Sequence, residues 1–147
     1  MNNPKLTIEL VPHTAWFNNV RSNVAPEIWK KLKKNTAHKA KYRCEICGGR
    51  GEKWAVECHE MWNYDDEKHQ QTLMGLIALC PSCHEVKHMG HTNLQGKAIE
   101  ATYHLAKVNG WSYEETINYV KAQFMAWQER SKYDWELDIT WLDQTRL

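Results

Sequence analysis

Four cysteines in two Cys-x-x-Cys pairs constrain the fold of this chain more than any other feature of its sequence. Cys44 and Cys47 form the first pair, and Cys80 and Cys83 form the second, which gives the spacing C-x2-C-x32-C-x2-C. Two such knuckles can place four thiolates around one Zn²⁺, and glycines and a proline beside the pairs favour the turns that knuckles need. The sequence therefore predicts a closed structural zinc site that stabilises the fold and does no chemistry.

The length and the N-terminal sequence indicate the class of protein. The chain has 147 residues, enough for one domain with a single core that needs no disulfides to fold. No basic and then apolar leader opens it, and no run approaches the ~18 apolar residues of a membrane span. We therefore expect a cytoplasmic protein with no membrane partner, in which paired cysteines bind metal.

The net charge of +1 conceals a strong asymmetry along the chain. Residues 21–53 contain ten Lys or Arg and three Glu, a balance of +7, whereas residues 54–147 contain eight basic and fourteen acidic residues, a balance of −6. Lysines on a helix can simply form its solvated face, but no acidic residue lies between Lys30 and Arg43, and a solvated face usually mixes signs. The basic segment thus favours a surface that binds phosphates.

Periodicity and breakers predict an α+β fold. The expected elements, in chain order, are a short strand over residues 6–11, a basic helix from Pro26 to about Ala40, a hairpin strand over 54–62, a charged loop over 63–71, an apolar segment over 73–80, a helix over 82–90 ended by Gly90, a helix over 97–108, and an extended segment over 133–142. A capping box at Ser112 and Glu115 opens one further helix, whose apolar stripe we interpret as core packing.

Four further metal-ligand residues remain once the paired cysteines are assigned. His84 and His88 stand at i and i+4 on one expected helix, so they face the same way and can share a metal ion. Cys58 and His59 lie on the expected hairpin strand. A lone histidine is more often a satisfied core residue, but this clustering beside a zinc knuckle favours a second metal site.

The order of these motifs resembles that of the HNH endonucleases. The segments "YRCEICGGRG", "VECHE" and "LIALCPSCHEVKH" match the zinc-stapled members of that family over about residues 40–91. The resemblance implies a ββα-metal core, in which a two-stranded hairpin and a helix hold one divalent ion. The N-terminal strand and basic helix (residues 6–41) and a helical extension (residues 92–147) would flank this core in a single domain.

The resemblance also implies roles for individual residues. His59 corresponds to the general base that deprotonates a water for attack on a phosphodiester of DNA, and Cys58, His84 and His88 correspond to ligands of the catalytic metal. That metal would be Mg²⁺, Mn²⁺, Ni²⁺ or Zn²⁺, and two copies of the chain could pair to cut both strands. The implied phosphate contacts are Lys30, Lys33, Lys34, Lys39, Lys41 and Arg43.

The chain departs from the family pattern at two positions. Gly75 stands where the family has the asparagine of its name, which braces the metal loop, and Asn63 or Asp65 could take over that role. Cys58 stands where the family often has His or Asp. A site with Cys and His ligands is softer and would favour Zn²⁺ over Mg²⁺.

Two rival hypotheses follow from the same residues. The first is a zinc protease, because residues 84–88 have the sequence H-E-x-x-H of the zinc-protease motif. Against it, Gly90 ends the expected helix soon after His88, and Leu94 stands where the extended motif has a third histidine. No sequence feature supports Glu114 or Glu115 as a distant ligand. Alternatively, the protein is a catalytically silent zinc module that binds nucleic acid or a protein through its basic helix and tryptophan-rich tail. Gly75 favours this second rival, and the eight tryptophans would serve either a core or a stacking and docking surface.

Overall fold

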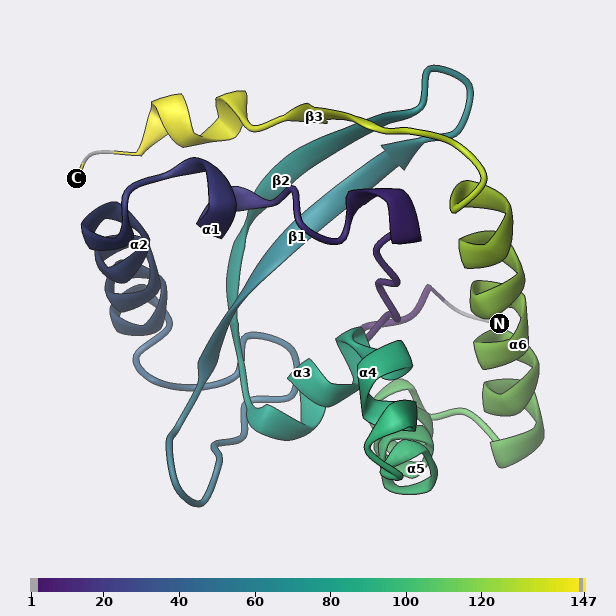
Figure 1. Ribbon diagram of the computed structural model, residues 1–147. Coiled ribbons are helices and arrows are strands. Elements are labelled where there is room, and N and C mark those ends of the chain that lie inside the picture. Colours follow the sequence, from purple (N-terminus) through teal and green to yellow (C-terminus); the bar gives the residue numbers. More distant parts are fainter. Residues whose placement is uncertain (1–2, 146) are drawn as a thin grey trace.

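A computed structural model describes residues 3–145 and residue 147 and has an α+β fold, which confirms the expected class (Figure 1). Its elements, in chain order, are η1 (His13–Ala15), α1 (Val20–Asn23), α2 (Pro26–Lys39), β1 (Glu57–Asp65), β2 (Gln70–Leu79), α3 (Pro81–Lys87), α4 (Met89–Leu94), α5 (Ala98–Asn109), α6 (Tyr113–Arg130), β3 (Glu136–Asp138) and η2 (Thr140–Gln144). Among the described residues, no helix has both the length and the apolar character needed to cross a bilayer.

A long antiparallel hairpin of β1 and β2 forms the centre of the fold, and β3 adds to β2 in parallel. The pairing runs from Glu57 opposite Leu79 to Asp65 opposite Gln70. Residues 63–71, expected to be a loop, therefore mostly belong to the two strands. Their polar composition hid this, because the cross-strand pairing outweighs the weak strand propensity of the segment.

Residues 6–11 alternate as expected but pair with no strand in the described part of the chain. Leu6 and Ile8 are buried, and side chains satisfy their backbone groups. The Asn109 amide accepts from the Leu6 N–H and donates to its carbonyl, and the Tyr119 hydroxyl accepts from the Ile8 N–H. The expected strand is thus an extended strap held by α5 and α6, because those side chains take the place of a neighbouring strand.

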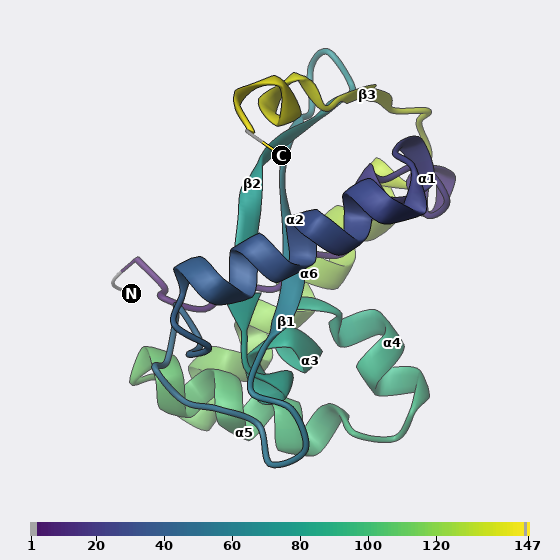
Figure 2. The same cartoon turned by 90° about the vertical axis from the view of Figure 1, so that its left-hand side faces the viewer.

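The strap and α2 belong to two separate hydrophobic clusters. The larger cluster joins the strap, the cysteine knuckles, α3 and α5, and it includes Leu6, Leu79 and Leu105. The smaller one lies between α2 and the sheet around Leu32 and Leu73. Consequently α2 and α6 lie on opposite sides of the hairpin (Figures 1 and 2).

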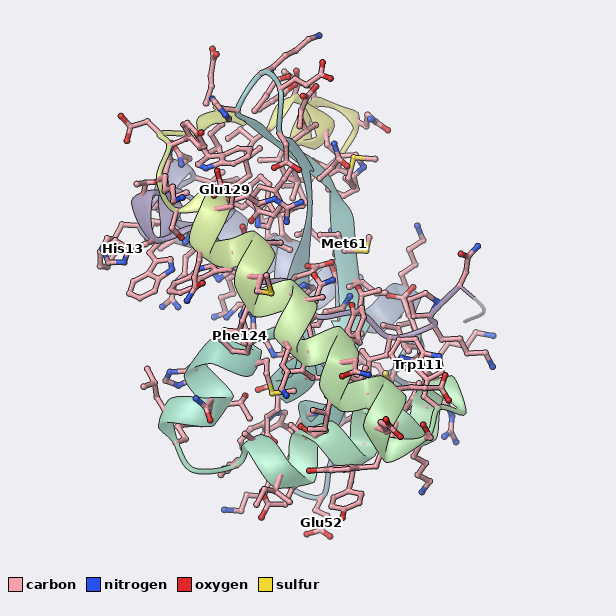
Figure 3. All side chains as sticks on the ribbon, turned by 90° about the vertical axis from the view of Figure 1, so that its right-hand side faces the viewer. His13, Glu52, Met61, Trp111, Phe124 and Glu129 are labelled. Carbon is pink, nitrogen blue, oxygen red and sulfur yellow. The ribbon has the colours of Figure 1, made fainter. Side chains whose placement is uncertain are left out.

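The chain after the hairpin is mostly helical. The expected helix over 82–90 is broken at His88 into α3 and α4, and Gly90 lies inside α4 instead of ending a helix. Two later expectations are met: α5 ends before Gly110, which has φ +68° as a C-cap glycine, and the capping box opens α6. The extended segment expected over 133–142 is present only in part, because β3 covers Glu136–Asp138 and η2 begins at Thr140. On α6, Phe124 packs against the larger cluster (Figure 3).

Candidate metal centres

The structure brings the four paired cysteines together, as the sequence predicts. Their sulfur atoms all lie within 4.8 Å of one another, and Cys47 Sγ is 3.6 Å from Cys80 Sγ. Thiolates bound tetrahedrally to one zinc ion at about 2.3 Å would be about 3.8 Å apart, so the spacing suits zinc. In each knuckle a backbone N–H points at the first sulfur at 3.4 Å, from Cys47 to Cys44 and from Cys83 to Cys80.

The pKa shifts of the clustered thiols also favour a bound cation. A hydrogen bond with Cys83 lowers the pKa of Cys44 to about 4, and the same hydrogen bond raises the pKa of Cys83 far above the usual range. Burial raises the pKa of Cys80 to about 11. All four sulfur atoms can therefore be thiolates together only when a cation such as Zn²⁺ is bound. His104, which no sequence motif indicated, lies against this cluster with Nε2 3.2 Å from Cys83 Sγ.

Three histidines form a second candidate metal centre. His59 lies on β1, His84 lies on α3, and His88 follows the last residue of that helix. One ring nitrogen of each lies within 4.8 Å of the others, and His84 Nε2 is 3.0 Å from His88 Nε2. Imidazole nitrogens this close can share one metal ion.

Two carboxylates fix the orientation of these rings. His59 Nε2 contacts Glu9 Oε2 at 2.5 Å, and His84 Nδ1 contacts Glu57 Oε1 at 3.0 Å. When the neutral His59 ring donates from Nε2 to Glu9, its lone pair is on Nδ1. That Nδ1 atom is buried and has no hydrogen-bond partner among the described residues. Buried polar atoms are almost always satisfied, so this nitrogen fits a metal ligand whose partner is the ion.

The protonation states suit metal binding as well. Burial lowers the pKa of His84, although its hydrogen bond with Glu57 opposes this. Burial, and then the neighbouring charges of His84 and His59, hold the pKa of His88 far below its usual range. Both rings are therefore neutral at neutral pH, which is the form that binds metal.

Glu9 is itself held in place by a buried lysine. Lys87 Nζ donates to Thr7 Oγ1 at 2.7 Å and to Glu9 Oε1 at 3.3 Å. Burial by itself would raise the pKa of Glu9, but the contact with His59 and the charge of Lys87 together lower it. Glu9 is thus a fixed carboxylate, delivered to the histidines by the N-terminal strap.

Cys58 is not placed with the histidines. Successive side chains of a strand point to opposite faces, and while His59 points toward α3, the Cys58 thiol lies beside Thr36 and Lys33 of α2. Burial raises the pKa of Cys58 to about 11, so it is a neutral thiol. His59 therefore takes the place of Cys58 in the candidate ligand set with His84 and His88.

The residues expected to brace the site lie elsewhere. A side chain at Gly75 would meet Met61 and Trp141, not the histidines. Asn63 is exposed on the hairpin, and Asp65 accepts backbone N–H groups in the hairpin turn. Glu9 performs the bracing instead, from a position 50 residues before His59 that no local motif could indicate.

The six basic residues also lie apart from the histidines. All six are exposed on α2 or just after it, and α2 packs on the face of the hairpin opposite His59. Lys33 lies over the Trp29 ring, 5.9 Å from its centroid. The structure thus places the candidate phosphate contacts and the histidine centre on different faces of one hairpin.

The H-E-x-x-H motif does not form a continuous helix, because α3 ends at Lys87 and His88 lies in the break before α4. Glu115, one of the distant acids, is instead part of the capping box of α6. A zinc protease needs both histidines on one helix, so the structure weighs against this rival.

Comparisons with protein families, curated proteins and solved structures give no significant match for this chain. The two centres themselves therefore provide the evidence for the function.

Glu9→Gln is expected to weaken metal binding at the three histidines by about 10- to 100-fold, because it removes the charge that raises the basicity of His59. The measurement is a competition titration with a chromophoric chelator, on protein whose cysteine site is already loaded and at a temperature where the variant is folded. Glu67→Gln, an exposed change in the hairpin turn, is the matched control. Unchanged affinity in Glu9→Gln would show that Glu9 does not act on the site.

Proposed function

We propose that this protein is a metal-dependent phosphodiesterase of the HNH type that cuts DNA. The observation that carries the proposal is the convergence of ring nitrogens of three histidines from β1 and the end of α3. His59 Nδ1, which is buried and has no hydrogen-bond partner among the described residues, supports it. The order of hairpin, knuckle and helix, which resembles that family, supports the same conclusion.

In this proposal His59, His84 and His88 hold the catalytic ion, while Glu9 and Glu57 orient two of the rings. The bound ion supplies Lewis acidity to a phosphate oxygen and makes an attacking water more acidic. Three imidazoles suit Zn²⁺ or Ni²⁺ better than Mg²⁺, which prefers oxygen ligands. We therefore expect activity with Zn²⁺, Ni²⁺ or Mn²⁺ to exceed activity with Mg²⁺.

The role proposed for His59 is that of a ligand, not the general base implied by the family resemblance. His84 and His88 line a pocket of about 270 Å³ beside the site, but His59 is only 3% exposed and does not line it. A base must reach the proton that it removes, whereas a ligand can lie beneath the ion. The burial of His59 and its hydrogen bond with Glu9 favour the role of a ligand.

DNA as the substrate is supported by the basic surface of α2, but this surface would act at a distance from the reaction. Because α2 lies on the other face of the hairpin, its lysines would contact phosphates away from the one that is cut. Such contacts hold and orient a duplex without reading its sequence. Loss of these contacts should therefore weaken DNA binding and leave the rate of cleavage within the bound complex unchanged.

Replacing Lys33 and Lys34 together by glutamine is expected to weaken DNA binding and to flatten its dependence on salt. Each lost phosphate contact lowers the slope of log K against log salt by about 0.9 for duplex DNA, so the pair should lower it by about 1.8. Lys121→Gln, an exposed change on α6, is the control. A salt slope equal to that of the unmodified protein would exclude these lysines from the interface.

The experiment that tests the proposed function incubates supercoiled plasmid with the purified protein and Mg²⁺, Mn²⁺, Ni²⁺ or Zn²⁺ in turn, beside His59→Ala. Nicking that depends on the metal and is lost in the variant is the expected result. Plasmid binding by both proteins without nicking under any metal would instead establish the silent zinc module.

A further inference from the structure

The pocket beside the histidine centre is lined mainly by α3 and α4. Its lining residues are Glu57, His84, Glu85, His88, His91, Thr92 and Gln95. His84 and His88 are the two proposed ligands that face this space, so a substrate would meet the ion from here. The other five side chains are then the groups available to a bound phosphodiester.

The break at His88 places His91 in this pocket. The chain turns there into α4, and Thr92 anchors the new helix by donating from Oγ1 to the Glu85 carbonyl at 2.6 Å. His91 is exposed, and its ring makes no hydrogen bond to any described residue. It is also close enough to His88 for its charge to help lower the pKa of that ring.

Hydrolysis of a DNA phosphodiester releases an alkoxide, a poor leaving group that needs a proton. Two of the pocket groups are committed elsewhere, because Glu57 holds His84 and Glu85 lies 3.8 Å from Lys97 Nζ. The Thr92 hydroxyl is buried in its bond to α3, and the Gln95 amide is no acid. Imidazole is the side chain that exchanges a proton near neutral pH, which leaves His91 as the donor.

We propose that His91 protonates the leaving oxygen when the chain cuts DNA, an inference that rests on the proposed function. Water attacks phosphorus and releases a proton to solvent, the bond from phosphorus to the leaving oxygen breaks, and that oxygen takes the proton of His91. Neutral His91 then regains a proton from solvent, so the step needs no further reactant.

The test compares two substrates whose leaving groups differ in their need for a proton, duplex DNA and bis(4-nitrophenyl) phosphate. His91→Gln is expected to lower kcat on DNA by about 10²- to 10⁴-fold, the contribution of a general acid, and to change kcat on the nitrophenyl ester by less than about threefold. Asn93→Ala, a neighbouring change outside the pocket lining, should leave both rates unchanged.

A second readout does not depend on turnover. In the metal-loaded protein, titration with dimethyl phosphate is expected to shift the ¹⁵N resonances of the His91 ring, and those of His13, which is exposed on η1 away from the basic surface of α2, should not move. The proposal fails if both substrates slow equally in His91→Gln, if DNA cleavage is unaffected, or if the His91 resonances stay fixed. Absence of hydrolysis of either substrate by the unmodified protein would instead overturn the proposed function, and this inference with it.

Discussion

Cys44→Ser is expected to abolish cooperative thermal unfolding of this protein. Binding of a structural zinc ion contributes about 10–16 kcal/mol at neutral pH in zinc-finger peptides, which matches or exceeds the 5–15 kcal/mol net stability of a typical domain. Cys44, Cys80 and Cys83 are themselves buried in the larger hydrophobic cluster, so opening the site also exposes the core. Circular dichroism during a thermal scan measures the effect.

The matched control for this variant is Cys58→Ser, because Cys58 is a half-buried neutral thiol outside both candidate centres. It should unfold cooperatively and lose less than about 1.5 kcal/mol, as is usual for a single change that disrupts no special feature. An excess of a strong chelator should reproduce the effect of Cys44→Ser in the unmodified protein. A chelated protein that melts as before would contradict a structural role for zinc.

His84→Ala is expected to reduce DNA cleavage by about 10³-fold or more, because it removes part of a centre that supplies several kcal/mol of transition-state stabilisation. The cysteine site is untouched, so the variant should still unfold cooperatively. The rate of plasmid nicking at a fixed metal concentration is the measurement. His13→Ala, an exposed change on η1 away from the basic surface of α2, is the control and should cut at the normal rate. Equal rates in the two variants would remove His84 from the site.

The parts of the site that follow from local spacing could be predicted from the sequence. Cysteines at i and i+3 in a knuckle, and His84 and His88 four residues apart, come together because helix and turn geometry bring them together. Cys58 and His59 differ by one position on a strand, and the direction in which each points depends on which face of the hairpin packs against α3. Tertiary packing decides which face that is, so the sequence could not assign the third ligand.

Long-range contacts account for the rest of what the sequence did not show. Asn109 and Tyr119 help to hold the N-terminal strap that delivers Glu9 to His59, and neither residue belongs to a motif that points to residues 6–11. The expected strand there had the right alternation but lacked a neighbouring strand. Similarly, the charge of α2 was evident in the sequence, but its position on the opposite face of the hairpin depends on how Leu32 packs against Leu73.

The central claim is that His59, His84 and His88 hold a metal ion separate from the one held by the four paired cysteines. Native mass spectrometry of the zinc-loaded protein, beside His59→Ala, counts the ions bound to each chain. Two zinc ions in the unmodified protein and one in the variant are the expected result. A single zinc ion in the unmodified protein, or two in His59→Ala, would contradict it.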